Sequence, residues 1–63
     1  MKREWLIVFR KAKGLTQSEV AEALKISQIT YSSYETGKRN PKPSMAKKIA
    51  KIFGFHWTKF YEE

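Results

Sequence analysis

Amide and hydroxyl groups dominate one face of a short helix predicted over residues 28–35. At 3.6 residues per turn, that face carries Gln28, Ile29, Ser32, Ser33 and Thr36. A solvated helix normally mixes lysine with glutamate, so an almost uncharged polar face is unusual. A glutamine amide can pair bidentately with adenine in the major groove of DNA, a serine can donate or accept, and an apolar side chain can contact a thymine methyl group. This face therefore has the chemistry needed to read base pairs, with Gln28 as the best single reader.

Cationic and polar residues flank the predicted helix on both sides. They are Arg10, Lys11 and Lys13 before the unit, and Lys38, Arg39, Asn40 and Lys42 after it. Two helices are predicted to begin at Gln17 and Gln28. The first turns of these helices direct backbone amides outward, which suits the binding of an anion. Phosphate contacts position a protein on DNA, whereas base contacts specify the sequence. Because the chain separates these two kinds of group, we expect double-stranded DNA as its partner.

The totals for the chain agree with a polyanionic partner. Its 63 residues carry a net charge of +7 and a pI near 9.9, which favours nucleic acid or an anionic membrane surface. A chain of this length without internal repeats is expected to form a single domain over residues 1–63, with one small core. It has no cysteine and no apolar run near the ~20 residues of a membrane span. We expect a cytoplasmic protein without cofactor or metal.

Two helix starts have clear capping signals. Thr16 and Glu19 form a T-x-x-E capping box, which predicts a helix that ends near residue 24 or 25. Ser27 is a good N-cap for the helix over residues 28–35, which Gly37 ends. Tyr31 is expected to face inward on that helix, together with Tyr34.

Three further helices complete the predicted fold. The first runs over residues 2–13, up to Gly14. After a basic loop, Pro43 suits the first turn of a fourth helix, whose apolar residues repeat at i, i+3, i+4 and i+7 up to Gly54. Residues 57–61 predict a last short helix with an aromatic side. No segment alternates like a strand, so the predicted class is all-α with five helices.

Several spaced motifs make the chain resemble the Cro/phage-repressor (Xre-like) helix-turn-helix family. They are R-x-x-K-G-L-T-Q at residues 10–17, E-V-A at 19–21, I-S at 26–27, Y-E-x-G-x-R-x-P at 34–41 and I-A-x-x-F-G at 49–54. The resemblance covers residues 6–61. It implies a compact five-helix, lambda-repressor-like domain whose second and third helices bind DNA. It also implies a transcriptional regulator, of which a repressor is the expected kind, although an activator is equally compatible with the residues.

Family roles carry over to matching positions. The resemblance implies a phosphate contact for Gln17, a helix crossing at Ala21 and an ion pair between Arg10 and Glu35. It implies contacts to bases or flanking phosphates for Ser27, Gln28, Ile29 and Ser33, and a phosphate-contacting loop at Lys38 and Arg39. The full set of predicted base contacts is Gln28, Ile29, Ser32 and Ser33. The predicted phosphate contacts are Arg10, Gln17, Ser27, Lys38, Arg39 and Asn40.

The chain departs from the family pattern at three places. Lys25 replaces the usual glycine of the turn, at a cost of ~1 kcal/mol if it adopts a left-handed conformation. Lys42 followed by Pro43 is a poor cap for the fourth helix, and His56 replaces a small polar cap before the last one. All three positions lie outside the predicted reading face.

Several residues have a simpler explanation than a role in a binding site. Tyr31 and Tyr34 have the spacing of core residues rather than base-stacking ones. The lysines of the fourth helix fit a solvated face, with phosphate contact as the alternative. Ile29 is equally compatible with a base contact and with a plain exposed apolar residue. His56 is not expected to bind metal, because zinc sites need three or four ligands and the chain offers no cysteine or second histidine.

Other classes of function fit less well. The chain has no nucleophile–base–carboxylate set and no glycine-rich phosphate loop, which argues against an enzyme. A protein-interaction module of the same fold, such as an antitoxin-like or coactivator-like partner, remains the alternative. One such domain contacts only a half-site, so we expect a homodimer on a pseudo-palindromic site. The dimer is expected to use this domain's own surface, with residues 57–61 as the candidate contact.

Overall fold

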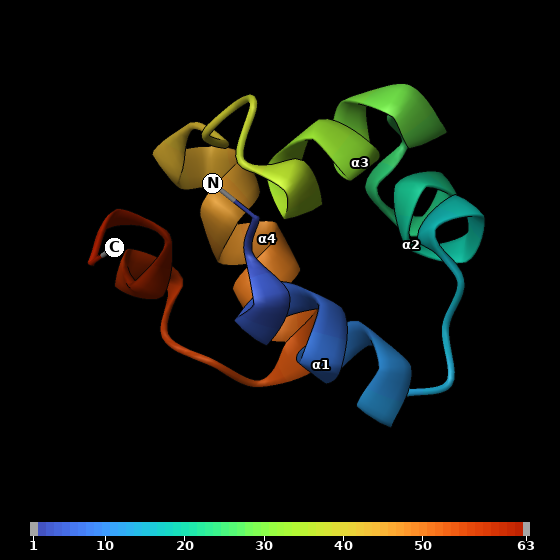
Figure 1. Cartoon of the computed structure of the whole chain (residues 1–63), viewed down its shortest axis with the longest axis horizontal. Helices are drawn as coiled ribbons and strands as arrows, with labels where there is room; N and C mark the ends of the chain where they lie inside the picture. The colour runs from blue at the N-terminus through green and yellow to red at the C-terminus, as the bar shows by residue number, and fades with distance from the viewer. Residues whose placement is uncertain (1, 63) are drawn as a thin grey trace.

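The computed structural model describes residues 2–62 and, over that range, contains helices and no strand. Figure 1 shows α2 and α3 together on one side of the molecule, the C-terminal segment on the other, and α1 and α4 between them. The helices are α1 (Glu4–Ala12), α2 (Gln17–Leu24), α3 (Gln28–Thr36), α4 (Pro43–Phe53) and the 3₁₀-helix η1 (Trp57–Tyr61). The all-α class is confirmed. The predicted count of five helices is not matched, because residues 2–62 form four α-helices and the last element is a short 3₁₀-helix.

The type of η1 follows from its length. Its closing bonds join residues three apart, from the amide of Lys59 to the carbonyl of His56 (3.0 Å) and from the amide of Glu62 to the carbonyl of Lys59 (3.3 Å). A five-residue helix gains few i→i+4 bonds, so the tighter 3₁₀ pattern can replace the α pattern. His56 caps the element, since its side chain accepts from the amide of Thr58. Tyr61 donates its hydroxyl to the carbonyl of Pro41, which anchors η1 to the loop before α4 (2.5 Å).

The first helix begins later than predicted. Residues 2 and 3 are not helical, and the amide of Arg3 instead donates to the carbonyl of Glu35 at 2.7 Å. This bond ties the start of the chain to the end of α3. Figure 1 shows the first described residues beside the end of α3.

The caps of α2 and α3 are present as the sequence predicts. The Thr16 hydroxyl accepts from the amide of Glu19 at 3.1 Å, and the Glu19 carboxylate accepts from the amide of Thr16 at 2.8 Å. Ser27 accepts from the amide of Thr30 at 3.1 Å. These bonds satisfy amides that have no partner within their own helix. α4 lacks a side-chain cap, and Pro43 stands in its first turn.

Lys25 adopts the left-handed conformation that its place in the turn requires, with φ 59° and ψ 41°. The amide of Ile26 then donates to the carbonyl of Ala21 at 3.0 Å, which closes the end of α2. Lys25 is the one non-glycine residue with positive φ among residues 2–62. The turn therefore keeps its usual geometry without its usual glycine.

The core sits where all the elements meet. Its fully or nearly fully buried side chains are Leu6, Val20, Ala21, Leu24, Tyr31, Tyr34, Ala46, Ile49, Phe53 and Phe60. The predicted inward positions of both tyrosines and of the α4 stripe are thus confirmed. On α1, Val8 is exposed, whereas Trp5 packs edge-on against Phe55 and Phe60. Within residues 2–62, no helix has the length and apolar character that crossing a membrane needs.

Candidate nucleic-acid interface

The outer face of α3 forms one side of a shallow hollow. The residues that line it are Gln17, Gln28, Ile29, Ser32, Ser33, Thr36 and Lys38. It therefore brings the start of α2, the polar face of α3 and the first basic residue after α3 to one surface. All four predicted base-contact residues lie there, and Ile29 is 83% exposed.

Some polar groups of this face are used in hydrogen bonds within the protein, whereas others remain available to a ligand. The Ser33 hydroxyl donates to the carbonyl of Thr30 at 2.5 Å, so its proton is used within the helix and its lone pairs are left to accept. Ser27 is occupied as a cap and also contacts the hydroxyl of Thr30 at 2.8 Å. The Gln28 amide is exposed, with no side-chain hydrogen bond found along the described chain. Gln28 therefore keeps both its donor and its acceptor for a ligand.

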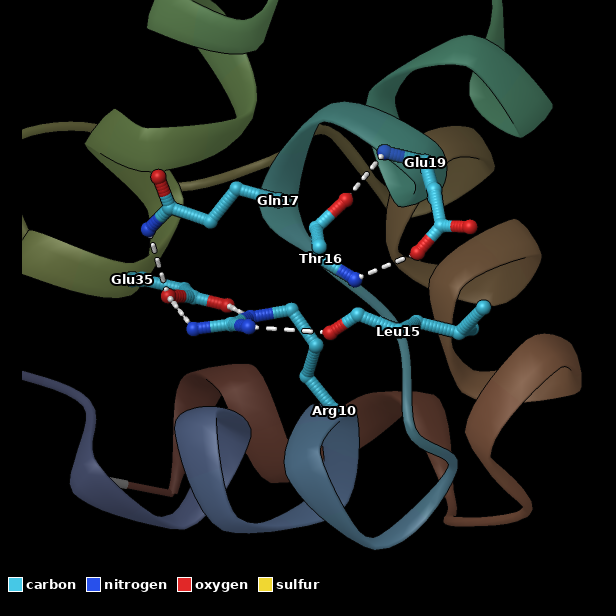
Figure 2. A network of polar contacts seen from close by, with 6 residues as sticks. All are labelled: Arg10, Leu15, Thr16, Gln17, Glu19 and Glu35. Carbon is cyan, nitrogen blue, oxygen red and sulfur yellow. Dashed lines mark hydrogen bonds and ion pairs between the residues drawn. The ribbon is translucent and has the colours of Figure 1, made fainter.

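A buried ionic network lies behind this face and joins three helices (Figure 2). The Arg10 guanidinium donates to the Glu35 carboxylate through Nε at 2.6 Å and through a terminal nitrogen at 3.3 Å. Its other terminal nitrogen donates to the carbonyl of Leu15 at 3.0 Å. The Gln17 amide nitrogen donates to the same carboxylate at 2.8 Å. The ion pair implied by the family resemblance is present, and Glu35 holds α1 and the start of α2 against α3.

Ionisation of this network follows from its contacts. The side chain of Glu35 is 1% exposed, and burial alone raises the pKa of its carboxyl group. Hydrogen bonds from Arg10 and Gln17, together with the charge of Arg10, outweigh the effect of burial. The pKa of Glu35 is therefore lowered below its ordinary value. The hydrogen bond to Glu35 raises the pKa of Arg10. Burial, together with the neighbouring Glu35, raises the pKa of Tyr31. The pair therefore stays charged at neutral pH while Tyr31 stays neutral.

The network constrains two of the predicted phosphate contacts. Arg10 uses all three guanidinium nitrogens inside the protein, and its side chain is 12% exposed. A carboxylate only accepts, so the Gln17 nitrogen must face Glu35, which leaves its second N–H for a phosphate. Arg10 therefore orients Gln17 through Glu35, in addition to any contact of its own.

The other predicted phosphate contacts stand on the loop after α3. Lys38, Arg39 and Asn40 are exposed, and the amide of Arg39 donates to the carbonyl of Ser33 at 3.2 Å, which holds the loop against α3. A second hollow is lined by Tyr34, Arg39, Asn40, Lys42, Ser44 and Met45. It adjoins the uncapped start of α4, so cationic side chains and helix amides share that surface.

Sequence reasoning missed one residue at this loop. Arg3 is 2% exposed and donates to the side-chain oxygen of Asn40 and to the carbonyl of Arg39. No periodicity identifies it, because it precedes α1 and a lone arginine in a basic chain is expected on the surface. Its burial depends on residues that are distant in sequence, among them Tyr34, Arg39, Asn40 and Phe60.

Sequence comparison with known proteins identifies a family and several relatives. The helix-turn-helix family model HTH_3 matches residues 7–60. Over 63 residues the chain is 44% identical to an uncharacterized HTH-type transcriptional regulator, YqaF of Bacillus subtilis, covering all of this chain and 83% of that protein. Over 45 residues it is 38% identical to the cryptic phage CTXphi transcriptional repressor RstR of Vibrio cholerae, covering 71% of this chain and 40% of that protein.

An archaeal relative is also similar. Over 46 residues the chain is 41% identical to an uncharacterized HTH-type transcriptional regulator, MJ0272 of Methanocaldococcus jannaschii, covering 73% of this chain and 70% of that protein. No solved structure gives a significant match. The family model spans all four α-helices but for the first residues of α1, and its matched range includes the whole of α2 and α3. The chain therefore belongs to the Cro/phage-repressor (Xre-like) helix-turn-helix family of DNA-binding proteins.

Proposed function

We propose that this non-enzymatic transcriptional regulator reads its operator by inserting α3 into the major groove of double-stranded DNA. The observation that carries the proposal is the exposed, almost uncharged face of α3, which shares one hollow with Gln17 and Lys38. Gln28 pairs with adenine, Ile29 contacts a thymine methyl group, and the hydroxyls of Ser32 and Ser33 reach neighbouring base edges. Ser33 acts as an acceptor there, because its proton is already donated within α3.

Phosphate contacts hold α3 in register on the duplex. Gln17 offers its second amide N–H at the start of α2, and Ser27 lies beside the start of α3. Lys38, Arg39 and Asn40 contact the backbone from the loop after α3. The side chain of Arg10 is 12% exposed, and all its guanidinium nitrogens are bonded within the protein, so its main part is to hold Gln17 and Glu35 in place. These contacts carry orientation and charge, whereas α3 carries sequence preference.

Repression is the proposed outcome of binding. A small domain on a half-site buries a limited interface, so useful affinity calls for two copies on a pseudo-palindrome. The candidate contact between copies is η1, where Tyr61 is 45% exposed and Trp57 is half-buried beneath Lys47. A dimer that occupies a promoter excludes polymerase from it. RstR, which carries the name of a transcriptional repressor, supports this direction.

The test combines site selection with two substitutions. Selecting bound sequences from random double-stranded DNA identifies the operator. On that operator, Gln28→Ala is expected to relax preference at one base pair, at a cost of about 1–3 kcal/mol. Arg39→Ala is expected to weaken binding to all sequences and to reduce the slope of log affinity against log salt by about 0.9. Affinity is measured by fluorescence anisotropy over a salt series.

Lys51→Ala is the matched control for Arg39→Ala. It removes the same charge from an exposed position near the end of α4 that is not among the proposed contacts, and it is expected to change affinity little. Circular dichroism establishes that each variant is folded. Folded Gln28→Ala and Arg39→Ala proteins with unaltered affinity and preference would refute the DNA-reading surface.

A further inference from the structure

Arg3 is a buried cation in a part of the chain that borders the proposed interface. Its side chain is among the largest fully buried ones, at 2% exposed, although it precedes α1. One terminal nitrogen donates to the carbonyl of Tyr34 at 2.5 Å and to the carbonyl of Arg39 at 3.1 Å. The other donates to Oδ1 of Asn40. A buried charge is tolerated only with good hydrogen-bond partners, and these acceptors supply them.

These bonds join elements that are far apart in the sequence. Tyr34 belongs to the last turn of α3, whereas Arg39 and Asn40 belong to the loop that follows it. The guanidinium carbon of Arg3 also lies 5.3 Å from the ring centre of Phe60 in η1. The backbone amide of Arg3 adds the bond to the carbonyl of Glu35. One residue thus fixes the loop against both α3 and η1.

The bond to Asn40 also determines which way its amide points. A guanidinium only donates hydrogen bonds, so the atom of Asn40 that faces Arg3 must be the oxygen. The amide nitrogen, with its two N–H groups, must then lie on the other side of the planar amide. A phosphate oxygen only accepts, so this orientation is the complementary one. Asn40 is exposed and lines the same hollow as Arg39 and Lys42.

We propose that Arg3 is a positioning residue for DNA binding: it holds the loop of Lys38, Arg39 and Asn40 and turns the amide nitrogen of Asn40 toward the phosphate backbone. The inference rests on the proposed function, since it assigns a residue that prepares that surface for its ligand. Arg3 itself is buried and does not touch the DNA. Its effect on affinity passes through the loop.

The first experiment compares Arg3→Met and Arg3→Lys with Lys48→Met on the selected operator. Lys48→Met removes one exposed charge from α4 and controls for the change in net charge. Arg3→Lys keeps the charge but lacks the planar fork that reaches several acceptors together. We expect both Arg3 variants to bind about tenfold more weakly, equivalent to ~1.4 kcal/mol. We also expect the slope of log affinity against log salt to become shallower in both Arg3 variants, by about 0.9 for each phosphate that the displaced loop no longer neutralises. The slope for Lys48→Met is expected to stay unchanged.

The second experiment separates the link to Arg3 from the donor offered to phosphate. Asn40→Asp keeps an acceptor for Arg3 but removes the amide donors, so it is expected to stay folded and to lose affinity. Asn40→Ala removes both groups. If Arg3 acts through Asn40, the losses in Arg3→Lys and Asn40→Ala are less than additive in the double variant. A purely structural role of Arg3 would give additive losses and an unchanged salt slope.

The outcomes distinguish the two proposals. Failure of the parent protein to select any sequence refutes the proposed function. A parent protein that binds, with folded Arg3 variants of equal affinity and salt slope, refutes the role of Arg3 and leaves the function intact. Additive losses refute it too. Should Arg3→Met fail to fold, Arg3→Lys and Asn40→Asp still decide the matter, because equal affinity of a folded Asn40→Asp protein also contradicts the proposal.

Discussion

Glu35 shows how a single buried carboxylate organises the proposed interface. It accepts from Arg10 of α1 and from Gln17 of α2, and it stands in the last turn of α3. Arg10 and Glu35 could be paired from the sequence, because they stand in the motifs R-x-x-K-G-L-T-Q and Y-E-x-G, and the family resemblance implies an ion pair between these positions. The bond from Gln17 to Glu35 could not, because only the folded arrangement brings the start of α2 to the end of α3.

Replacing Glu35 with glutamine is expected to destabilise the protein by about 3 kcal/mol at neutral pH, since it leaves the charge of Arg10 without its counterpart. The pKa of Glu35 is lowered in the folded protein, so its contribution is present above the ordinary carboxyl value and is lost as pH falls through the folded pKa. The stability gap between the parent protein and Glu35→Gln should therefore shrink in acid. Urea unfolding at a series of pH values from 7 down to about 3 measures this gap.

Glu22→Gln is the control for this measurement. Glu22 is an exposed carboxylate of α2, and its removal is expected to change stability by less than about 0.5 kcal/mol. A gap between the parent protein and Glu35→Gln that stays constant with pH would mean that Glu35 does not titrate as its contacts require.

At the scale of elements, the helix boundaries set by capping residues were the most predictable part of the fold. Thr16 and Ser27 cap the starts of α2 and α3 through local bonds, and Gly37 ends α3 in a left-handed conformation, so these boundaries depend only on nearby residues. The last helix was misjudged because apolar spacing over five residues does not distinguish an α-helix from a 3₁₀-helix. The start of α1 was misjudged because the bond of Arg3 to Glu35 is not local.

Lys25 places a conformational cost inside the helix-turn-helix pair. Its φ of 59° is readily adopted by glycine but unfavourable for a residue with a Cβ atom. Lys25→Gly is therefore expected to stabilise the protein by up to about 1 kcal/mol, because the relief of strain exceeds the added entropy of the unfolded chain. For a domain of this size, such a gain raises Tm by roughly 4–8 °C, which calorimetry measures.

The same substitution at a helical position supplies the control. Lys48→Gly, in the middle of α4, is expected to destabilise by about 1 kcal/mol, since glycine is a poor helix former. The two variants have the same composition and the same charge, so the opposite signs isolate backbone conformation. If Lys25→Gly is as destabilising as Lys48→Gly, the side chain of Lys25 contributes something to the turn that outweighs its strain.

Over the whole molecule, the elements divide between support and recognition. The side chains of α1, α4 and η1 build the core with the inner faces of α2 and α3, and the outer face of α3 remains exposed. Amphipathic spacing predicted this division, because it depends on the burial of apolar residues in a single small core. The exposure of Gln28 and Ile29 on one face was predictable, because residue type and helical periodicity determine it. The burial of Arg3 was not predictable, because it depends on contacts across the fold.

Dimerisation through the domain's own surface would make operator spacing rigid. Two copies that touch through η1 can bind cooperatively only when their half-sites lie about one helical turn apart, ~34 Å. Adding half a turn of DNA rotates one site to the opposite face, and adding a full turn separates the copies beyond contact. Both insertions are therefore expected to abolish cooperativity, with a loss of at least about tenfold in affinity, or ~1.4 kcal/mol. A flexible tether between copies would instead tolerate the full turn.

Sedimentation of the protein on the selected operator and on its two insertions measures this directly. We expect two copies to bind the parent operator together, and to bind each inserted operator independently. Tyr61→Ala on the parent operator should reproduce the loss if η1 forms the contact, while Val8→Ala, an exposed apolar change on α1, serves as its control. Because Tyr61 also anchors the loop at Pro41, affinity for an isolated half-site must be measured for the same variants. A protein that is monomeric both free and on the operator would rule out the dimer, whatever the half-site affinity.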